Sequence, residues 1–262
     1  VGVYFQQMFG FGDRFFLTAA VRADDNSSFG ENFDLVYYPK VSGSWVVSEE
    51  GFWGDNFVSS FRLRAAYGES GQQPDAFDAL RSYNTRASPS GAATVTPDSP
   101  GNPDLGPERG VEVEAGFDAA LFGDRVSLDF TYYDQTTKDA IVARDVAPSN
   151  GFTASQFVNI GQINNRGIEV GLGARIIETE GFDWDLNVNL STNRNRVEDL
   201  GLDGFLQLGW TTRHTVGYPV GSMWAPDVIF AEFIPGTEQI DPDTMRCDDG
   251  TGQPVVCDEN AW

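Results

Sequence analysis

Residues 111–133 read VEVEAGFDAALFGDRVSLDFTYY, and the fold prediction starts from the pattern in this stretch. Apolar residues occupy alternate positions in its first half: Val111, Val113, Ala115, Phe117 and Ala119. After residues 122–125 the alternation resumes with Val126, Leu128, Phe130 and Tyr132. Period-two alternation gives a β-strand one apolar face and one polar face. The stretch therefore predicts two antiparallel strands joined by a short turn.

The same alternation recurs along the chain, at residues 15–24, 61–68, 168–176 and 184–191. These runs are about nine to twelve residues long, close to the roughly 9–11 residues that a tilted strand needs to cross a bilayer. Strands of soluble sandwiches are shorter, at about 5–6 residues. We therefore predict an all-β protein, a transmembrane antiparallel β-barrel that is partial, with about ten long up-and-down strands of a larger barrel.

Connections alternate between short and long. The tetrapeptide FGDR occurs at 11–14 and again at 122–125, and EGFD at 180–183 is a third short turn. Between them, we expect residues 71–104, 137–163 and 198–262 to be mostly loops. Short turns at one end and long loops at the other are typical of outer-membrane barrels, whose long loops are extracellular.

Charged and amide side chains gather on the predicted polar faces, and a water-filled lumen would require this. We expect the following residues to face the lumen and line a substrate path: Arg22, Asp24, Arg62, Arg64, Glu112, Glu114, Asp129, Glu169, Arg175, Asn187 and Asn189. Aromatic residues lie near the strand ends, for example Trp45, Trp53 and Trp184, as an interfacial girdle would place them.

A second hypothesis is a soluble extracellular β-sandwich that serves as a binding or adhesion module. Its strands alternate in the same way, but their apolar faces meet in a core. An enzyme is not expected. The carboxylates could act as a glycosidase pair in principle, but strand alternation accounts for their spacing. His214 is the only histidine, and no Ser/His/Asp set is visible.

The composition and the hydropathy exclude two further classes of protein, those that bind nucleic acid through a basic surface and those that cross a membrane with a helix. The formal net charge is −22, from 39 acidic and 17 basic residues, so no basic footprint for nucleic acid exists. No window of about 20 apolar residues is present, which excludes a membrane-spanning helix.

Two cysteines, Cys247 and Cys257, lie ten residues apart in a polar stretch, and we expect them to form a disulfide in an oxidising compartment. The acidic residues around them are a weak candidate Ca²⁺ site in an extracellular loop, because carboxylate oxygens suit that ion. These residues are Asp241, Asp243, Asp248 and Asp249. No other cofactor is expected.

Several blocks of the sequence resemble SusC/RagA-type TonB-dependent transporters. In chain order they are residues 22–30 (RADDNSSFG), 38–45 (YPKVSGSW), 61–72 (FRLRAAYGESGQ), 102–108 (NPDLGPE), 131–139, 159–169 (NIGQINNRGIE) and 217–222. The resemblance implies that residues 1–262 are part of a TonB-dependent receptor barrel domain, with the family's plug domain absent from this chain.

The same resemblance implies a function and partners. The complete protein would import nutrients such as oligosaccharides or peptides across the bacterial outer membrane. A SusD-like lipoprotein would act as a lid over the outer loops. The TonB–ExbB–ExbD complex would supply energy through the missing plug, and outer-membrane lipid would surround the barrel.

Overall fold

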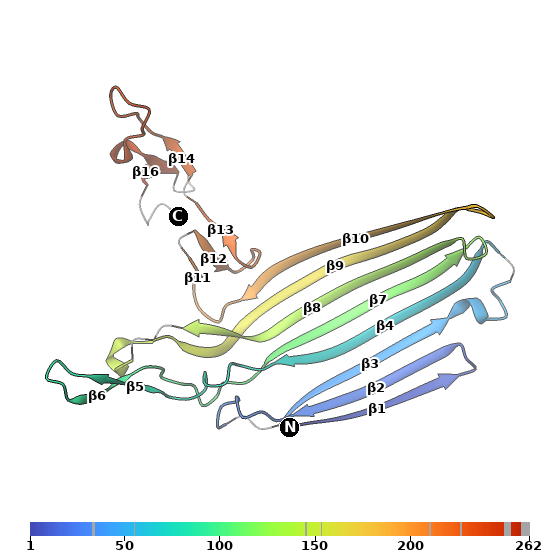
Figure 1. Cartoon of the computed structure of the whole chain (residues 1–262), viewed down its shortest axis with the longest axis horizontal. Helices are drawn as coiled ribbons and strands as arrows, with labels where there is room; N and C mark the ends of the chain where they lie inside the picture. Colours follow the sequence, from blue (N-terminus) through green and yellow to red (C-terminus); the bar gives the residue numbers. More distant parts are fainter. Residues whose placement is uncertain are drawn as a thin grey trace.

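The structure is a computed structural model, and it describes all residues except 33–34, 55, 145, 153, 210, 226, 249–252 and 258–262. Eight long strands form one sheet in the order β1-β2-β3-β4-β7-β8-β9-β10 (Figure 1). Their bounds are β1 Gly2–Phe11, β2 Phe15–Asp24, β3 Val36–Val46, β4 Val58–Gln72, β7 Glu108–Leu121, β8 Val126–Arg144, β9 Gln156–Thr179 and β10 Phe182–Asp199. Each pairs antiparallel with its neighbours, which confirms the predicted up-and-down order.

The described part of the chain has eight long strands, fewer than the ten or so expected. The chain beyond Asp199 forms only short strands in two separate small sheets. These are β11 Phe205–Gln207, β12 Thr212–Thr215 and β13 Ser222–Met223 in one, and β14 Asp227–Phe230, β15 Arg246–Asp248 and β16 Pro254–Val256 in the other. Three short 3₁₀ turns complete the elements: η1 Val47–Glu49, η2 Pro148–Asn150 and η3 Pro242–Thr244.

All three predicted short turns are present at one end of the sheet. In the first, Gly12 and Asp13 both have positive φ, at 56° and 55°. Two central residues with positive φ are the mark of the type I′ turn, whose twist matches that of the flanking strands. The repeat of the tetrapeptide also places Phe122, Gly123 and Asp124 at positive φ. We call this end of the sheet the short-turn end.

The predicted loops are partly wrong. Residues 137–163 are not mostly loop, because β8 continues to Arg144 and β9 already begins at Gln156. Residues 71–104 contain the hairpin of β5 Tyr83–Ala87 and β6 Ala93–Pro97, which projects from the long-loop end (Figure 1). Alternation becomes irregular in these extensions, since β-bulges interrupt the register after Thr137, and the sequence pattern fades there.

At the long-loop end, residues 101–108 contact both the connection between β2 and β3 and the beginning of β9. Gly30 donates its N–H to the carbonyl oxygen of Leu105 at 2.8 Å, and Leu105 is completely buried. On the other side, the Asn159 side chain bonds both backbone groups of Gly106, accepting from its N–H at 2.8 Å and donating to its C=O at 2.9 Å. Asn102 donates to the carbonyl oxygen of Phe157 at 2.9 Å. We call this set of contacts the rim lock.

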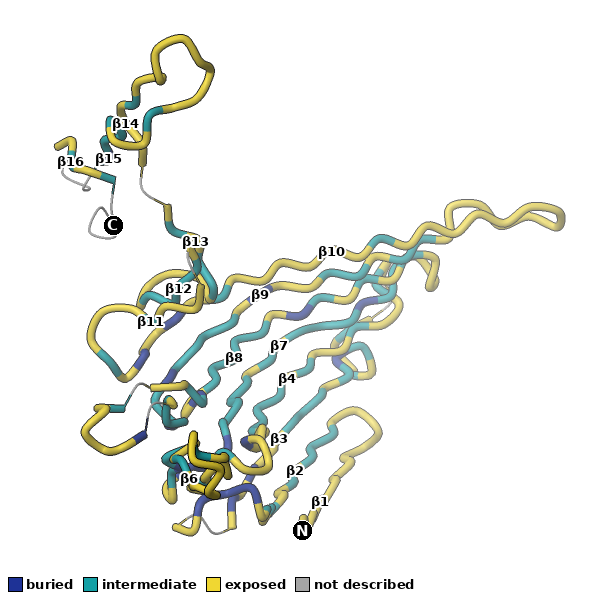
Figure 2. Tube along the Cα trace, turned by 60° about the vertical axis from the view of Figure 1, so that its left-hand side comes forward, coloured by how far each residue is buried: buried dark blue, intermediate teal, exposed yellow. Residues whose placement is uncertain are grey.

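The eight-stranded sheet is a single layer. Neither a second sheet nor a helix covers it in the part of the chain that is described, and most positions along the strands are partly or fully exposed (Figure 2). Large apolar side chains such as Phe5 and Leu190 are 65 % and 64 % exposed. The sandwich hypothesis required apolar faces pressed together, and it is therefore wrong. Among the described residues, no helix has the length and apolarity to cross a membrane.

Candidate functional site

The strand register places all the predicted lumen residues on one side of the sheet. Directly opposed residues of antiparallel strands point to the same face, and the face alternates along each strand. One row of opposed residues runs through Arg62, Asp118, Asp129, Gly171 and Asn189, from β4 to β10. By the same register, the remaining predicted residues share this side: Arg22, Asp24, Arg64, Glu112, Glu114, Glu169, Arg175 and Asn187. We call it the polar face.

The opposite side, the apolar face, carries a continuous band of aliphatic and aromatic residues. Its rows include Trp45, Leu63, Phe117, Phe130, Val170 and Leu190, all opposed in register. From the row through Leu121 and Val126 to the row through Tyr132 and Ile168, no described residue on this face is charged. Such a band is about 25 Å tall in outer-membrane barrels.

Aromatic rings line the band toward the short-turn end. Trp53, Phe61, Phe117 and Phe130 form a ladder in which successive ring centroids are 5.7, 5.6 and 5.5 Å apart. The Trp45 indole N–H donates to Glu50 at 3.0 Å, so that ring has an apolar body and a polar edge. Rings of this kind lie at the headgroup level of a membrane.

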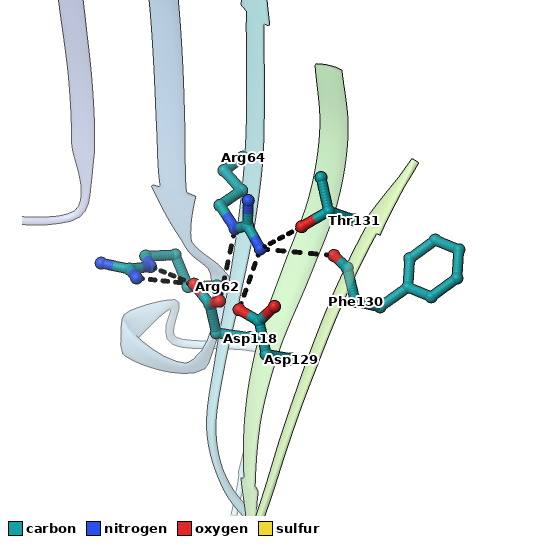
Figure 3. Close-up of polar contacts among 6 residues, drawn as sticks. All are labelled: Arg62, Arg64, Asp118, Asp129, Phe130 and Thr131. Atoms are coloured by element: carbon teal, nitrogen blue, oxygen red, sulfur yellow. Dashed lines mark hydrogen bonds and ion pairs between the residues drawn. The ribbon is translucent and has the colours of Figure 1, made fainter. Parts of the chain in front are cut away.

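The densest polar contacts centre on Arg64, which reaches across three strands (Figure 3). Its Nε lies 3.3 Å from Asp118 of β7, and its Nη2 lies 2.9 Å from Asp129 of β8. The same Nη2 donates to Thr131 Oγ1 at 2.7 Å. Arg62 engages the other oxygen of Asp118 at 2.6 Å, so that carboxylate accepts from two arginines. The network neutralises the charge of the wall locally and ties β4, β7 and β8 together on the polar face.

Gly116 makes this reach possible. It is the β7 residue directly opposed to both Arg64 and Thr131. A Cβ at position 116 would collide with the carbonyl oxygen of Phe130 and would lie 3.2 Å from the Arg64 guanidinium carbon. Glycine therefore lets the guanidinium lie flat across β7. Sequence reasoning placed Arg64 on the lumen side but had no means of assigning this role to Gly116.

Elsewhere on the polar face, only some carboxylates pair with arginines. Arg175 lies 3.9 Å from Asp185 of β10, and it also pairs with Glu178 at 3.2 Å. Arg22 pairs with Asp24 on its own strand at 2.8 Å. The structure gives no ion pair among its described residues for Glu112, Glu114 and Glu169. These three carboxylates leave the polar face acidic on the long-loop side of the arginine network.

A hollow of about 710 Å³ lies on the polar face beside this network. Its floor is formed by Gly171 and Gly173 of β9, and one side is formed by Asn187 and Asn189 of β10. Asp129 borders the other side. Glycines lower the floor because they have no side chain, so the flanking amides and carboxylates form its walls. The hollow is open and has hydrogen-bonding side chains along its edges, which suits transient contact with a hydrated solute better than enclosure of one.

Outside the sheet, the structure reveals a cluster that the sequence analysis missed. The Arg213 guanidinium lies 4.4 Å from the ring centroid of Phe205 and 4.0 Å from that of Trp224. Tyr218 packs edge-on against Trp224 at 4.7 Å. The adjacent His214 accepts a hydrogen bond from the Gly221 N–H at 3.0 Å through Nδ1, and burial lowers the pKa of this histidine. No spacing in the sequence signals this cluster, because its members come from β11, from β12, from the turn after β12 and from the residue that follows β13.

The predicted disulfide is present, with Cys247 and Cys257 bonded and their Cα atoms 5.1 Å apart. Three of the four candidate Ca²⁺ residues lie in the described part of the chain. Asp241 caps η3 by accepting from the Asp243 N–H, and Asp248 lies in β15, while Asp249 lies outside the described residues. Among the residues that are described, no three acidic, histidine or cysteine side chains are grouped to hold a metal ion.

An apolar face with an uncharged band and a charged polar face on a single sheet define a wall segment of a transmembrane β-barrel. The chain matches the family model "TonB dependent receptor-like, beta-barrel" over residues 1–234. It therefore belongs to the TonB-dependent receptor family of outer-membrane β-barrel proteins, as the sequence blocks predicted. This family consists of receptors and transporters.

Two individual relatives carry the name of the same family. TonB-dependent receptor P26 of Formosa agariphila is 30 % identical over 96 % of this chain and 26 % of the relative. TonB-dependent receptor SusC of Bacteroides thetaiotaomicron is 27 % identical over 84 % of this chain and 24 % of its own length. The chain thus spans about a quarter of the length of these curated relatives.

Among solved structures, the RagAB peptide importer in its closed-closed state matches 97 % of this chain and 28 % of the importer chain. The TM-score is 0.81 at 23 % identity. The open-open state of the same importer gives a TM-score of 0.82 at 21 % identity. At these identities the likeness establishes the fold.

Proposed function

We propose that this chain forms part of the barrel wall of a TonB-dependent importer, with its polar face lining the route that a nutrient takes. The observation that carries the proposal is the division of the sheet. Eleven polar residues predicted from alternation share one face, and the opposite face is uncharged from the row through Leu121 and Val126 to the row through Tyr132 and Ile168. Transport of this kind requires no chemistry on the solute.

Cysteine labelling in the full-length receptor tests this division. The two cysteines of this chain, Cys247 and Cys257, are bonded to each other and are not free to react with the reagent. We expect Asn189→Cys, on the polar face, to react with a charged, membrane-impermeant thiol reagent in intact outer membranes. The matched variant Val188→Cys, one residue away on the apolar face, should react only with a lipid-soluble reagent. Equal labelling of the two by the charged reagent would refute the lumen assignment.

We further propose that the solutes are water-soluble oligomers such as peptides or oligosaccharides. The name of one structural relative, the RagAB peptide importer, supports peptides. The open hollow beside Asn187, Asn189 and Asp129 supports a hydrated solute of either kind, because it offers both hydrogen-bond donors and acceptors.

Growth of the source bacterium on each class of nutrient tests the substrate. Deletion of the receptor should abolish growth on one class as sole source, and the wild-type gene should restore it. We expect Arg64→Ala to slow uptake, whereas Arg86→Ala on the β5–β6 hairpin should leave uptake unchanged. A deletion strain that grows normally on all peptides and oligosaccharides would contradict the importer proposal.

For partners, we propose a SusD-like lipoprotein lid over the long-loop end and TonB–ExbB–ExbD acting through a plug domain. The rim lock supports a lid, because it presents connected loops as one fixed surface. Purification of the tagged receptor in mild detergent should recover a surface lipoprotein in near-equal amount. Absence of any such protein under conditions that retain activity would contradict the lid.

A further inference from the structure

Basic residues gather on the outer side of the wall, directly beyond the uncharged band. On the apolar face, the next row toward the long-loop end holds Asp134, Arg166 and Arg194 in register. Arg196 follows two residues later on the same side of β10. All three arginines are exposed. We call Arg166, Arg194 and Arg196 the arginine patch.

The carboxylates nearby do not neutralise this patch. Asp134 directly opposes Arg166, but its carboxylate accepts from the Asn164 side chain at 2.6 Å. Within the described structure, Arg166 and Arg194 make no ion pair. Arg196 has only a long contact with Glu198 at 3.6 Å. This is unusual in a chain whose net charge is −22, where acidic partners are abundant.

Arg166 and Arg194 also directly oppose each other across β9 and β10. Like charges at directly opposed positions destabilise a strand pair. The repulsion is stronger near a membrane, where the effective dielectric is lower than in water. A bound anion between the two guanidinium groups would remove this cost, and guanidinium groups bind phosphate through paired hydrogen bonds.

The height of the patch identifies the anion. Arg166 lies ten residues from Ile176, near the other edge of the band, which is roughly 33 Å along the strand at about 3.3 Å per residue. With a strand tilt of about 40°, this corresponds to a height of about 25 Å, the thickness of the apolar band. Tyr132, one row below, and Tyr67, on the same row, are the aromatic residues expected at that boundary. The patch therefore lies at the headgroup level of the leaflet on the long-loop side.

We propose that the arginine patch binds the phosphate of a lipid headgroup in that leaflet. Below the patch, Ile168 and Leu190 offer an apolar surface for the acyl chains of the same lipid, and both are exposed. A free phosphate ion would gain nothing from that surface. The occupant is thus an amphiphile that carries phosphate, and the polar lumen is not involved.

Lipid binding by the purified full-length receptor tests the proposal. The probes are lipid A, the phosphorylated glycolipid of the outer leaflet, its dephosphorylated form, and inorganic phosphate. We expect wild type to bind lipid A at least tenfold more tightly than the dephosphorylated form. Each basic residue near an anionic leaflet contributes about 1 kcal/mol, roughly a factor of five. Arg166→Gln with Arg194→Gln should therefore weaken lipid A binding about thirtyfold.

Matched variants separate charge from folding. Arg86→Gln with Arg144→Gln removes the same charge from the β5–β6 hairpin and the end of β8, and it should leave lipid A affinity unchanged. Arg166→Lys with Arg194→Lys keeps the charge and should restore most of the affinity, which a merely structural role would not predict. If the double glutamine variant does not fold, Arg194→Gln alone should weaken binding about fivefold.

Three results would overturn the proposal: equal binding of both lipid forms by wild type, equal losses in the patch and control variants, or inorganic phosphate binding as tightly as lipid A. The last result would identify a site for the free ion.

Discussion

The long sheet and the β14–β16 module at its far end are built on opposite principles. In the sheet, β9 and β10 are paired from residues 162–199, yet almost nothing along them is fully buried. In the module, the strands are only three or four residues long, but Cys247 is completely buried and bonded to Cys257. The sheet is held by backbone ladders, whereas the module is held by one covalent bond and local caps.

This contrast shows what each part needs from its surroundings. Backbone groups cannot remain unpaired in hydrocarbon, so a membrane sheet depends on neighbouring strands at both edges and on lipid against its apolar face. A small module in water cannot bury enough apolar surface to be stable without a cross-link. The four predictions below test this difference, beginning with the largest expected effect.

Residues 1–262 alone should fail to form a stable monomer. The sheet ends at β1 and β10, and each leaves a row of unpaired N–H and C=O groups. Expression of this segment by itself, in detergent or lipid, should give aggregates on size-exclusion chromatography. A monodisperse, protease-resistant monomer would show that the sheet does not depend on further strands.

A charge on the apolar face should destabilise the full-length barrel strongly. The variant Leu172→Arg places this charge midway along the apolar run of β9. An arginine at the bilayer midplane destabilises a barrel by about 2–4 kcal/mol. The matched control is Asn189→Arg, on the polar face of β10, for which we expect a change of about 0.5 kcal/mol. The free energy of unfolding from urea titration in lipid vesicles measures both. Equal losses would mean that the two faces meet the same medium.

Removal of the disulfide should loosen the module and leave the sheet intact. Cys247→Ser with Cys257→Ser opens a ten-residue loop, which chain-entropy arguments value at about 2–3 kcal/mol. Protease cleavage within residues 227–257 should accelerate, while the heat-induced mobility shift of the barrel on gels stays unchanged. A lowered barrel transition would show that the module stabilises the sheet as well.

The smallest effect concerns pH near β12. Burial lowers the pKa of His214, and its Nδ1 accepts from Gly221 only when that nitrogen is unprotonated. The resulting local stability is present above the unfolded pKa of about 6.5 and is lost as pH falls through the lower folded pKa. The hydrogen-exchange protection factors of residues 212–223, which compare each measured rate with the intrinsic rate at the same pH, should therefore decrease at low pH. His214→Gln should remove this pH dependence, and an unchanged profile in that variant would refute it.

The sheet was largely predictable because alternation is a local property. Whether Asp129 or Leu128 lies on the polar face depends only on strand parity, and all the residues placed by parity share one face. The turn at Gly12 and Asp13 was equally visible, since few residues adopt positive φ. The strand ends were not, because the bulges after Thr137 break the period while the backbone pairing continues.

Contacts between distant segments could not be predicted. The cation–π cluster of Arg213 and the support of Arg64 by Gly116 depend on which strands become neighbours, and no single stretch encodes that information. The family resemblance identified residues 22–30, 102–108 and 159–169 as separate blocks. The structure adds that these blocks contact one another in the rim lock.

The rim lock also determines where the receptor tolerates added sequence. Because residues 101–108 hydrogen-bond to the β2–β3 connection on one side and to the beginning of β9 on the other, an insertion there would displace these segments together. The turn of the β5–β6 hairpin, residues 88–92, lies beyond these bonds and is held only by its own strands. An epitope or fluorophore for tracking the receptor on living cells belongs at that turn, because an insertion there would leave the hydrogen bonds of the rim lock unchanged.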